Sequence, residues 1–201
     1  MSGGERLSGG SAPAEARFEK VVVISGHMID SPGRTPPRFP PEAEGPVRRV
    51  MERVLTDRGV GQRDLAITGG ARGADILGAE LCLARGAAVW LLVPLPEREF
   101  LERSVRLPGS DWVERFHALK YRCIVRYQQD ELGPPPSGQS PFVRNNQWCL
   151  DTGRAVVGDE RLLGLVVWDE QPTDREGGAA DFVARATKRG VQIEIVNPTA
   201  L

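Results

Sequence analysis

Residues 67–87 have the sequence ITGGARGADILGAELCLARGA, and this stretch decides the fold. It begins as the end of an apolar run, passes through Gly69, Gly70 and Gly73, and continues with helical spacing. Glycine permits positive φ and lets a ligand come close to the backbone. The helix behind such a loop offers unpaired N–H groups and a partial positive charge. We therefore expect a strand, a phosphate-facing loop and a helix. The alternative is a tight turn in which Asp75 only supports the helix start.

Similar units flank this stretch on both sides. Short apolar runs predict five strands, at residues 21–24, 65–70, 88–94, 162–168 and 191–196. Helical spacing predicts helices at residues 41–59, 71–86, 97–105, 111–121, 141–157 and 177–190. Strands that alternate with helices indicate an α/β, Rossmann-like three-layer fold with a mainly parallel sheet and helices on both faces.

The composition fits one such domain. The chain has 201 residues, of which 40% are hydrophobic and 26% charged, an ordinary globular mixture. Residues 1–18 are rich in Gly, Ser and Ala and predict a flexible tail, so the domain is expected at residues 19–201. The formal net charge of -1 gives no global electrostatic reason to expect binding to nucleic acid or to a membrane.

Cysteine and histidine are too few and too scattered for a disulfide framework or a metal site. The chain has 3 cysteines, at positions 82, 123 and 149, and 2 histidines. It contains no apolar run long enough to span a membrane and no signal-peptide pattern at its start. We expect a cytoplasmic protein of bacterial type that needs no cofactor or metal.

The predicted sheet indicates where a ligand would bind. Ligands of parallel sheets bind outside the carboxyl ends of the strands. This rule places the loops after Ile24, Thr68, Val93 and Trp168 on one edge. Prolines in the loop after Val93 suggest a rigid wall.

The loop after the first strand contains Ser25, Gly26, His27 and Asp30. His27 is a candidate for hydrogen bonding to a ribose or for carrying a proton. The alternative is a structural histidine, which is the more frequent role of a lone histidine. Arg34 and Arg38 follow in this loop, either solvated or as part of a lid.

Two further loops add candidates. Arg72, expected in the first turn of its helix, suits a bidentate phosphate contact. Asp169 ends the fourth strand and could accept from a ribose hydroxyl, while Gly177 and Gly178 precede a helix whose N-terminus suits an anion. A surface loop with a helix cap is the alternative there.

Ser140 and Pro141 have the residue types of an N-cap and a first helical position. In the helix that they open, Arg144 and Asn145 suit a ribose or a base, or face solvent. Taken together, the predicted ligand-binding residues are Ser25, Gly26, His27, Thr68, Gly69, Gly70, Arg72, Gly73, Asp75, Arg144, Asn145, Asp169, Gly177 and Gly178.

These motifs resemble the SLOG superfamily, the Rossmann-like group that joins DNA-processing proteins with the LOG phosphoribohydrolases. Residues 68–75, TGGARGAD, are similar to the S-G-x-A-R-G-x-D loop of the DNA-processing branch, and SGHMID, PFVRNNQW and VWDEQP…GGAADF add to the resemblance over residues 20–196. The resemblance implies a nucleotide ligand, a homodimer, and an effector or signalling partner encoded in the same operon.

The chain departs from the hydrolase branch, which carries P-G-G-x-G-T-x-x-E. No glutamate stands in register here, and the nearest carboxylates are Asp75 and Glu80, the latter almost two helical turns into its helix. Asp75 and Glu80 are therefore weak catalytic candidates, with Asp30 and Asp169 as further carboxylates.

Three functions follow, in decreasing order of support. The first is binding or sensing of a nucleotide or nucleotide-derived signal, of the ADP-ribose/NAD-like or cyclic nucleotide class. The second is a LOG-like N-glycosidase, a phosphoribohydrolase acting on nucleoside 5'-monophosphates, which needs a carboxylate near the anomeric carbon. The third is single-stranded DNA binding, to which the net charge gives little support.

Overall fold

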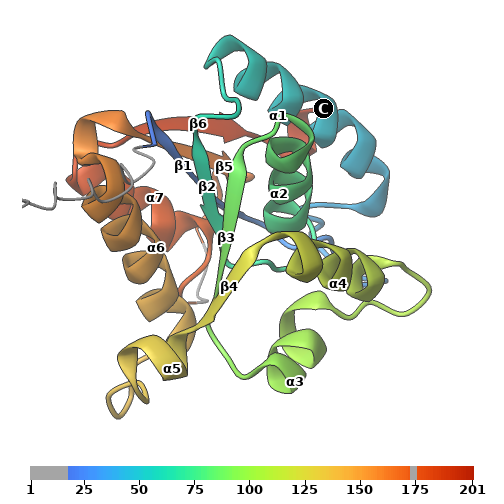
Figure 1. Ribbon diagram of the computed structural model, residues 1–201. Coiled ribbons are helices and arrows are strands. Elements are labelled where there is room, and N and C mark those ends of the chain that lie inside the picture. Colours follow the sequence, from blue (N-terminus) through green and yellow to red (C-terminus); the bar gives the residue numbers. More distant parts are fainter. Residues whose placement is uncertain (1–17, 173–175) are drawn as a thin grey trace, which may run out of the picture.

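Six parallel strands form one sheet, in the order β4-β3-β2-β1-β5-β6 (Figure 1). The computed structural model describes residues 18–172 and 176–201. The strands are β1 (Val21–Gly26), β2 (Leu65–Thr68), β3 (Ala88–Val93), β4 (Ile124–Tyr127), β5 (Leu162–Val167) and β6 (Gln192–Val196). The parallel sheet expected from the alternation of strands and helices is confirmed.

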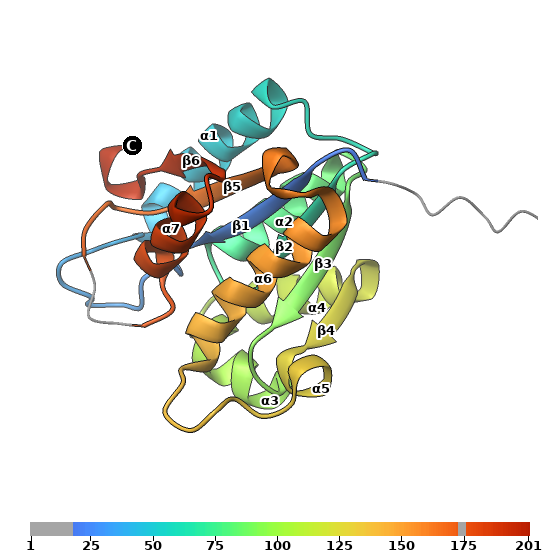
Figure 2. The same cartoon turned by 90° about the vertical axis from the view of Figure 1, so that its left-hand side faces the viewer.

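Helices cover both faces of the sheet, as predicted. The helices are α1 (Glu44–Asp57), α2 (Ala74–Ala84), α3 (Glu97–Phe100), α4 (Trp112–Arg122), α5 (Gln128–Leu132), α6 (Pro141–Val157) and α7 (Ala179–Lys188). A π-helical turn, Leu101–Val105, continues α3. Helices α1, α2 and α4 lie on one side of the sheet, and α6 and α7 lie on the other (Figures 1 and 2). Among the described helices, none has the length and apolar character needed to cross a bilayer.

The two faces have separate apolar cores because successive strand residues point to opposite sides. Val22 and Ile24 of β1 face α1 and α2, whereas Val21 and Val23 face α6 and α7. Helix α2 lies so close to β1 that a Cβ on Gly78 would come 2.7 Å from Cγ2 of Ile24. Close contact with the sheet on one face therefore fixes the position of α2.

Helix α2 differs from the sequence prediction in two ways. The sequence predicted one buried stripe, of Ala74, Leu77, Leu81 and Ala84, but most of the helix is buried because it packs between the sheet, α1 and α4. Ala84, in the last turn, is exposed. The helix also begins at Ala74, so Arg72 precedes the first turn instead of lying in it.

Other boundaries follow the predictions closely, with a few corrections. The sequence prediction missed β4 and α5. Pro141 is the first residue of α6 as expected, although the Ser140 side chain makes no capping hydrogen bond. The predicted tail at residues 1–18 lies outside the described residues except for Phe18, whose ring packs edge-on against Trp90.

The order of strands creates a crevice at one edge of the sheet. Strands β1 and β5 are neighbours, but the chain leaves β1 toward α1 on one face and leaves β5 toward α7 on the other. Connections that diverge in this way leave space above the carboxyl ends of the two strands.

Candidate functional site

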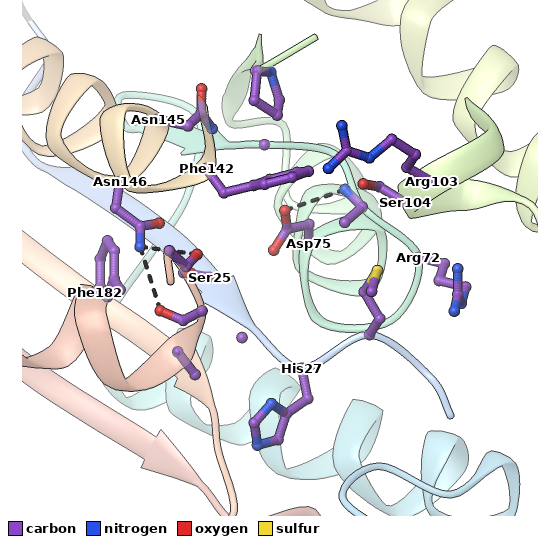
Figure 3. Close-up of a pocket in the computed structure, with 18 of the residues that line it drawn as sticks. Ser25, His27, Arg72, Asp75, Arg103, Ser104, Phe142, Asn145, Asn146 and Phe182 are labelled. Carbon is purple, nitrogen blue, oxygen red and sulfur yellow. Dashed lines mark hydrogen bonds between the residues drawn. The ribbon is translucent and has the colours of Figure 1, made fainter. Parts of the chain in front are cut away.

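A cavity of about 760 Å³ lies at this crevice. Its walls come from the loops after β1, β2, β3 and β5 and from the first turns of α6 and α7 (Figure 3). The predicted placement of these four loops on one edge is therefore confirmed. The predicted ligand-binding residues that line the cavity are Ser25, Gly26, His27, Gly69, Arg72, Asp75, Asn145, Gly177 and Gly178.

Arg72 brings a buried positive charge to the cavity wall. It is 8% exposed. Its guanidinium donates to the carbonyl oxygens of Ile29 and Arg106, at 3.1 and 3.3 Å, and to the hydroxyl of Ser31, at 3.3 Å. All three acceptors are neutral, and no ion pair joins Arg72 to a carboxylate within the described residues. Burial lowers the pKa of Arg72, and the charge of Asp30 opposes this effect.

The backbone of the glycine loop is partly occupied by the protein itself. The N–H of Ala71 donates to Oδ2 of Asp75 at 3.2 Å, and that of Arg72 donates to the carbonyl of Ser104 at 2.9 Å. The N–H of Ala74 donates to the carbonyl of His27 at 3.1 Å. These three donors hold the loop in shape, so N–H groups at this helix start, which the sequence predicted to be unpaired, are partly used within the chain.

Asp75 supplies the carboxyl group that accepts a hydrogen bond from this loop. It belongs to the first turn of α2, is 9% exposed and lines the cavity. Burial raises the pKa of Asp75 to about 7, although hydrogen bonding from the backbone of Ala71 and from other groups of the loop opposes the rise. Asp75 can therefore exist in both protonation states near neutral pH.

Two asparagines of α6 face the same region. Asn145 accepts a hydrogen bond from Gln128 at 3.4 Å, and its Nδ2 lies 3.8 Å from the sulfur of Cys149. Asn146 donates to the carbonyl of Gly177 at 3.2 Å and so fixes the approach to α7. Both asparagines line the cavity, and Asn146 also positions the turn before α7.

His27, Asp169 and Arg38 form an ionic cluster beside the cavity, which we call the clasp. Nε2 of His27 lies 2.9 Å from Oδ1 of Asp169, and Arg38 donates two hydrogen bonds to the same carboxylate, both of 2.8 Å. Burial raises the pKa of Asp169, but hydrogen bonds from Arg38, His27 and the backbone of Gln171 outweigh it and hold this pKa well below its usual range. Burial lowers the pKa of His27, although the hydrogen bond to Asp169 opposes this.

Asp30 shapes the loop that carries Arg38. Its Oδ2 accepts from the backbone N–H groups of Arg38 and Phe39, at 2.7 and 2.9 Å, and its Oδ1 pairs with Arg34 at 3.2 Å. Asp30 lines the cavity, but these contacts occupy both of its oxygens.

Several predicted site residues do not line the cavity. These are Thr68, Gly70, Gly73, Arg144, Asp169 and Glu80. Arg144 donates to the carbonyls of Leu132 and Gly133 and so holds the end of α5. Glu80 points away from the cavity, toward Arg48 and Arg115, each at 2.8 Å.

Three glycines are explained by contacts within the chain. A Cβ on Gly73, where φ is +90°, would lie 2.7 Å from the carbonyl oxygen of His27. A Cβ on Gly26 would lie 2.5 Å from the carbonyl oxygen of Val167, and one on Gly177 would lie 2.4 Å from the nitrogen of Val143. The tight-turn interpretation therefore accounts for these positions without a ligand. Gly69 differs, because the atoms nearest to an added Cβ would belong to polar side chains of the cavity wall, Oδ2 of Asp75 at 3.0 Å and Nδ2 of Asn145 at 3.2 Å, and not to backbone.

The sequence prediction did not include the aromatic part of the wall. Phe100, Phe142 and Phe182 line the cavity, and the guanidinium of Arg103 lies 5.2 Å from the ring centre of Phe142 (Figure 3). The only sequence signal for Phe142 as a wall residue was its position after Pro141, at the start of a predicted helix. Arg103 lies in the π-helical turn, which has no sequence signature.

No group of three or more His, Cys, Asp and Glu side chains is placed to hold a metal ion within residues 18–172 and 176–201. The chemistry of the cavity wall is that of a guanidinium, a carboxyl group, amides and aromatic rings. Such a wall can hold an anion, hydroxyl groups and a planar ring in one ligand.

Comparison with known proteins adds a likeness in architecture. No family model matches the sequence, and the comparison with curated proteins gives no match. Among solved structures, the chain is similar to DNA processing protein A (DprA) from Streptococcus pneumoniae, with 16% sequence identity and a TM-score of 0.48. The likeness covers 90% of this chain and 50% of that chain, so this chain spans about half the length of that protein. The resemblance of the motifs to the SLOG superfamily stays a prediction.

Proposed function

We propose that this chain binds a phosphate-bearing nucleotide, or a signal derived from one such as an ADP-ribose-like or cyclic nucleotide, in the cavity beside Arg72. The observation that carries the proposal is the buried guanidinium of Arg72, whose acceptors among the described residues are all neutral. Removing a charge from water costs several kcal/mol unless an opposite charge compensates it. The carboxylate of Asp30 acts on Arg72 from a distance and pairs with Arg34 instead, so a ligand phosphate in the cavity would supply the directly contacting opposite charge.

The size and the walls of the cavity support the same proposal. A volume of about 760 Å³ lies within the roughly 300–1,000 Å³ of small-molecule sites. Phe142 offers an aromatic face on which a base can stack. Gly178 and Ala179, at the start of α7, line the cavity, and a helix N-terminus suits an anion.

A thermal-shift panel tests this proposal, with AMP, ADP, ATP, NAD, ADP-ribose, cyclic dinucleotides and short single-stranded DNA. A ligand at about 100 times its Kd adds roughly 2.7 kcal/mol to the free energy of unfolding, which raises the Tm by several degrees. We expect Arg72→Met to weaken the binding at least tenfold. Arg48→Met, which removes an arginine that pairs with Glu80 outside the cavity, is expected to bind as the wild type does.

Two results of the panel would overturn the proposal. One is the absence of any shift with every phosphate-bearing ligand. The other is a shift of equal size in the Arg72→Met variant and in the wild type. Binding of single-stranded DNA alone, weakening steeply with added salt, would favour the DNA-binding alternative instead.

A second candidate function, cleavage of an N-glycosidic bond, is favoured by Asp75. Of the four candidate carboxylates, Asp30 and Asp169 are paired with arginines and Glu80 lies outside the cavity. Asp75 lines the cavity and forms no ion pair with a described residue. Chromatography of the AMP samples tests this candidate, since a freed base that disappears in Asp75→Asn would establish it. Intact ligand favours a binding protein.

A further inference from the structure

We infer that Asp75 and Asn145 together recognise the sugar hydroxyls of the ligand, so that the cavity selects ribonucleotides over 2'-deoxyribonucleotides. This inference rests on the proposed function and adds a substrate class to it. It depends on how two buried polar side chains from different helices converge at one point of the cavity wall.

The acceptor comes from Asp75. Its Oδ2 accepts from the N–H of Ala71 at 3.2 Å (Figure 3). The carboxyl group is 9% exposed and lines the cavity. An ionised carboxylate has about four lone-pair sites, so Asp75 can accept from a ligand hydroxyl in addition to the loop.

The free donor comes from Asn145. This residue is 7% exposed and also lines the cavity. Its Oδ1 accepts from Gln128, which leaves Nδ2 with only a long contact of 3.8 Å to the sulfur of Cys149. Sulfur is a weak acceptor, so the amide keeps its capacity to donate to a ligand.

Gly69 shows that the two groups flank one small space. A Cβ added to Gly69 would lie 3.0 Å from Oδ2 of Asp75 and 3.2 Å from Nδ2 of Asn145. The absence of a side chain at this position keeps that space open beside the cavity. The acceptor of Asp75 and the donor of Asn145 therefore lie close together beside Gly69, where any side chain would crowd both.

A sugar hydroxyl fits this pair better than the other parts of a nucleotide. A hydroxyl both donates and accepts, which matches a carboxyl group beside an amide, and the neighbouring hydroxyls of ribose supply two such groups. A phosphate would be repelled by the charged form of Asp75, and an apolar group would leave both side chains unpaired. In Figure 3, Asp75 lies between Arg72 on one side and Ser25 and Phe182 on the other, so a sugar at Asp75 leaves the Arg72 side of the cavity to the phosphate.

Isothermal titration calorimetry of the full chain tests the inference, with AMP against 2'-deoxy-AMP and 3'-deoxy-AMP, and with ATP against 2'-deoxy-ATP. We expect the ribonucleotides to bind at least tenfold more tightly than the deoxy compounds. Asp75→Asn, Asn145→Ala and Gly69→Ala are expected to lower the affinity for the ribonucleotides and to leave that for the deoxy compounds nearly unchanged. The control is Glu80→Gln, also on α2 but outside the cavity, in which the preference is expected to persist.

The outcomes separate this inference from the proposed function. Equal binding of ribose and deoxyribose ligands, lost in Arg72→Met, would keep the proposed function and overturn the inference. A ribose preference that persists in both Asp75→Asn and Asn145→Ala would also overturn it. No binding of any of these nucleotides would overturn both. Because the deoxy ligands need no variant, the test holds even where a substitution prevents folding.

Discussion

Asp169 accepts two hydrogen bonds from Arg38, from Nε to Oδ2 and from Nη2 to Oδ1, each of 2.8 Å. The two residues are 131 positions apart, and their pairing joins the loop after β1 to the loop after β5 beside the cavity. His27 completes the clasp at 2.9 Å from the same carboxylate. One buried charge thus fixes the relative position of two walls.

We predict that Asp169→Asn lowers the free energy of unfolding by about 3 kcal/mol, because breaking a buried ion pair leaves the remaining charge of Arg38 uncompensated. Urea unfolding at pH 7 measures the loss. Glu19→Gln is the control: it removes an exposed pair with Arg63, and we expect a change below about 0.5 kcal/mol.

The same variant has a defined pH dependence. Since the folded state holds the pKa of Asp169 below its usual value, the stabilisation by this carboxylate is fully present above about pH 4–5 and is lost as the pH falls further. The difference between wild type and Asp169→Asn should therefore shrink in acid. A difference of the same size at pH 3 and pH 7 would contradict this assignment.

Asp75→Asn is predicted to stabilise the free protein at alkaline pH. Burial raises the pKa of Asp75 to about 7, against about 3.9 in the unfolded chain. At pH values between these two pKa values, the native state binds more protons than the unfolded state. The free energy of unfolding therefore falls as the pH rises, by about 1.4 kcal/mol per pH unit. The variant lacks this slope. Unfolding at pH 5 and pH 8 should show its advantage growing by roughly 2–3 kcal/mol, and an unchanged difference would contradict the predicted pKa.

Gly73→Ala is expected to destabilise the fold by more than about 3 kcal/mol, combining backbone strain with a clash. Its φ is +90°, and a Cβ there would lie 2.7 Å from both the carbonyl oxygen of His27 and the nitrogen of Ile29. Gly33→Ala is a matched control, because its φ is +79° but no atom lies within 4 Å of the added Cβ. We expect a cost of only about 1–2 kcal/mol there. Equal losses in thermal unfolding would show that the contact with the loop after β1 has no energetic effect.

Phe142→Ala is predicted to weaken AMP binding by about 10- to 100-fold, since stacking on an aromatic ring contributes roughly 1–3 kcal/mol per base. Phe142→Tyr keeps the ring and should retain the affinity. Ribose 5-phosphate lacks the base, so its affinity should be the same for wild type and both variants. Calorimetry with both ligands measures these differences. An equal loss for both ligands in Phe142→Ala would mean that the ring shapes the cavity without contacting the base.

The pattern of strands and helices was predictable because buried parallel strands are continuous apolar runs. Val21–Ile24 is such a run, and β1 forms there. Strand β4 was missed for the opposite reason: it has four residues, lies at the sheet edge, and leaves Ile124 about half exposed beside Arg126. A short edge strand has no two-sided burial to impose an apolar sequence on it.

The edge that carries the site was predictable, but the partner of each residue was not. The sequence shows that Gly69 and Gly73 lack a side chain, yet not whether a ligand or another segment of backbone uses the space. The structure distinguishes them, with Gly69 at the cavity and Gly73 against the loop after β1. The pairing of Arg38 with Asp169 depends on tertiary distance and leaves no local signal. The predicted homodimer and effector partner involve other chains, and they stay predictions.

The cavity wall is drawn from residues between Ile24 and Phe182, in five separate segments of the chain. None of these segments forms a binding surface alone, so the site exists only once the sheet and both helical layers have assembled. A bound ligand then opposes every opening that separates the layers. We expect it to slow hydrogen exchange throughout β1, β2 and β5, far beyond the residues that it touches. In this architecture, ligand binding is thermodynamically coupled to the folding of the whole domain.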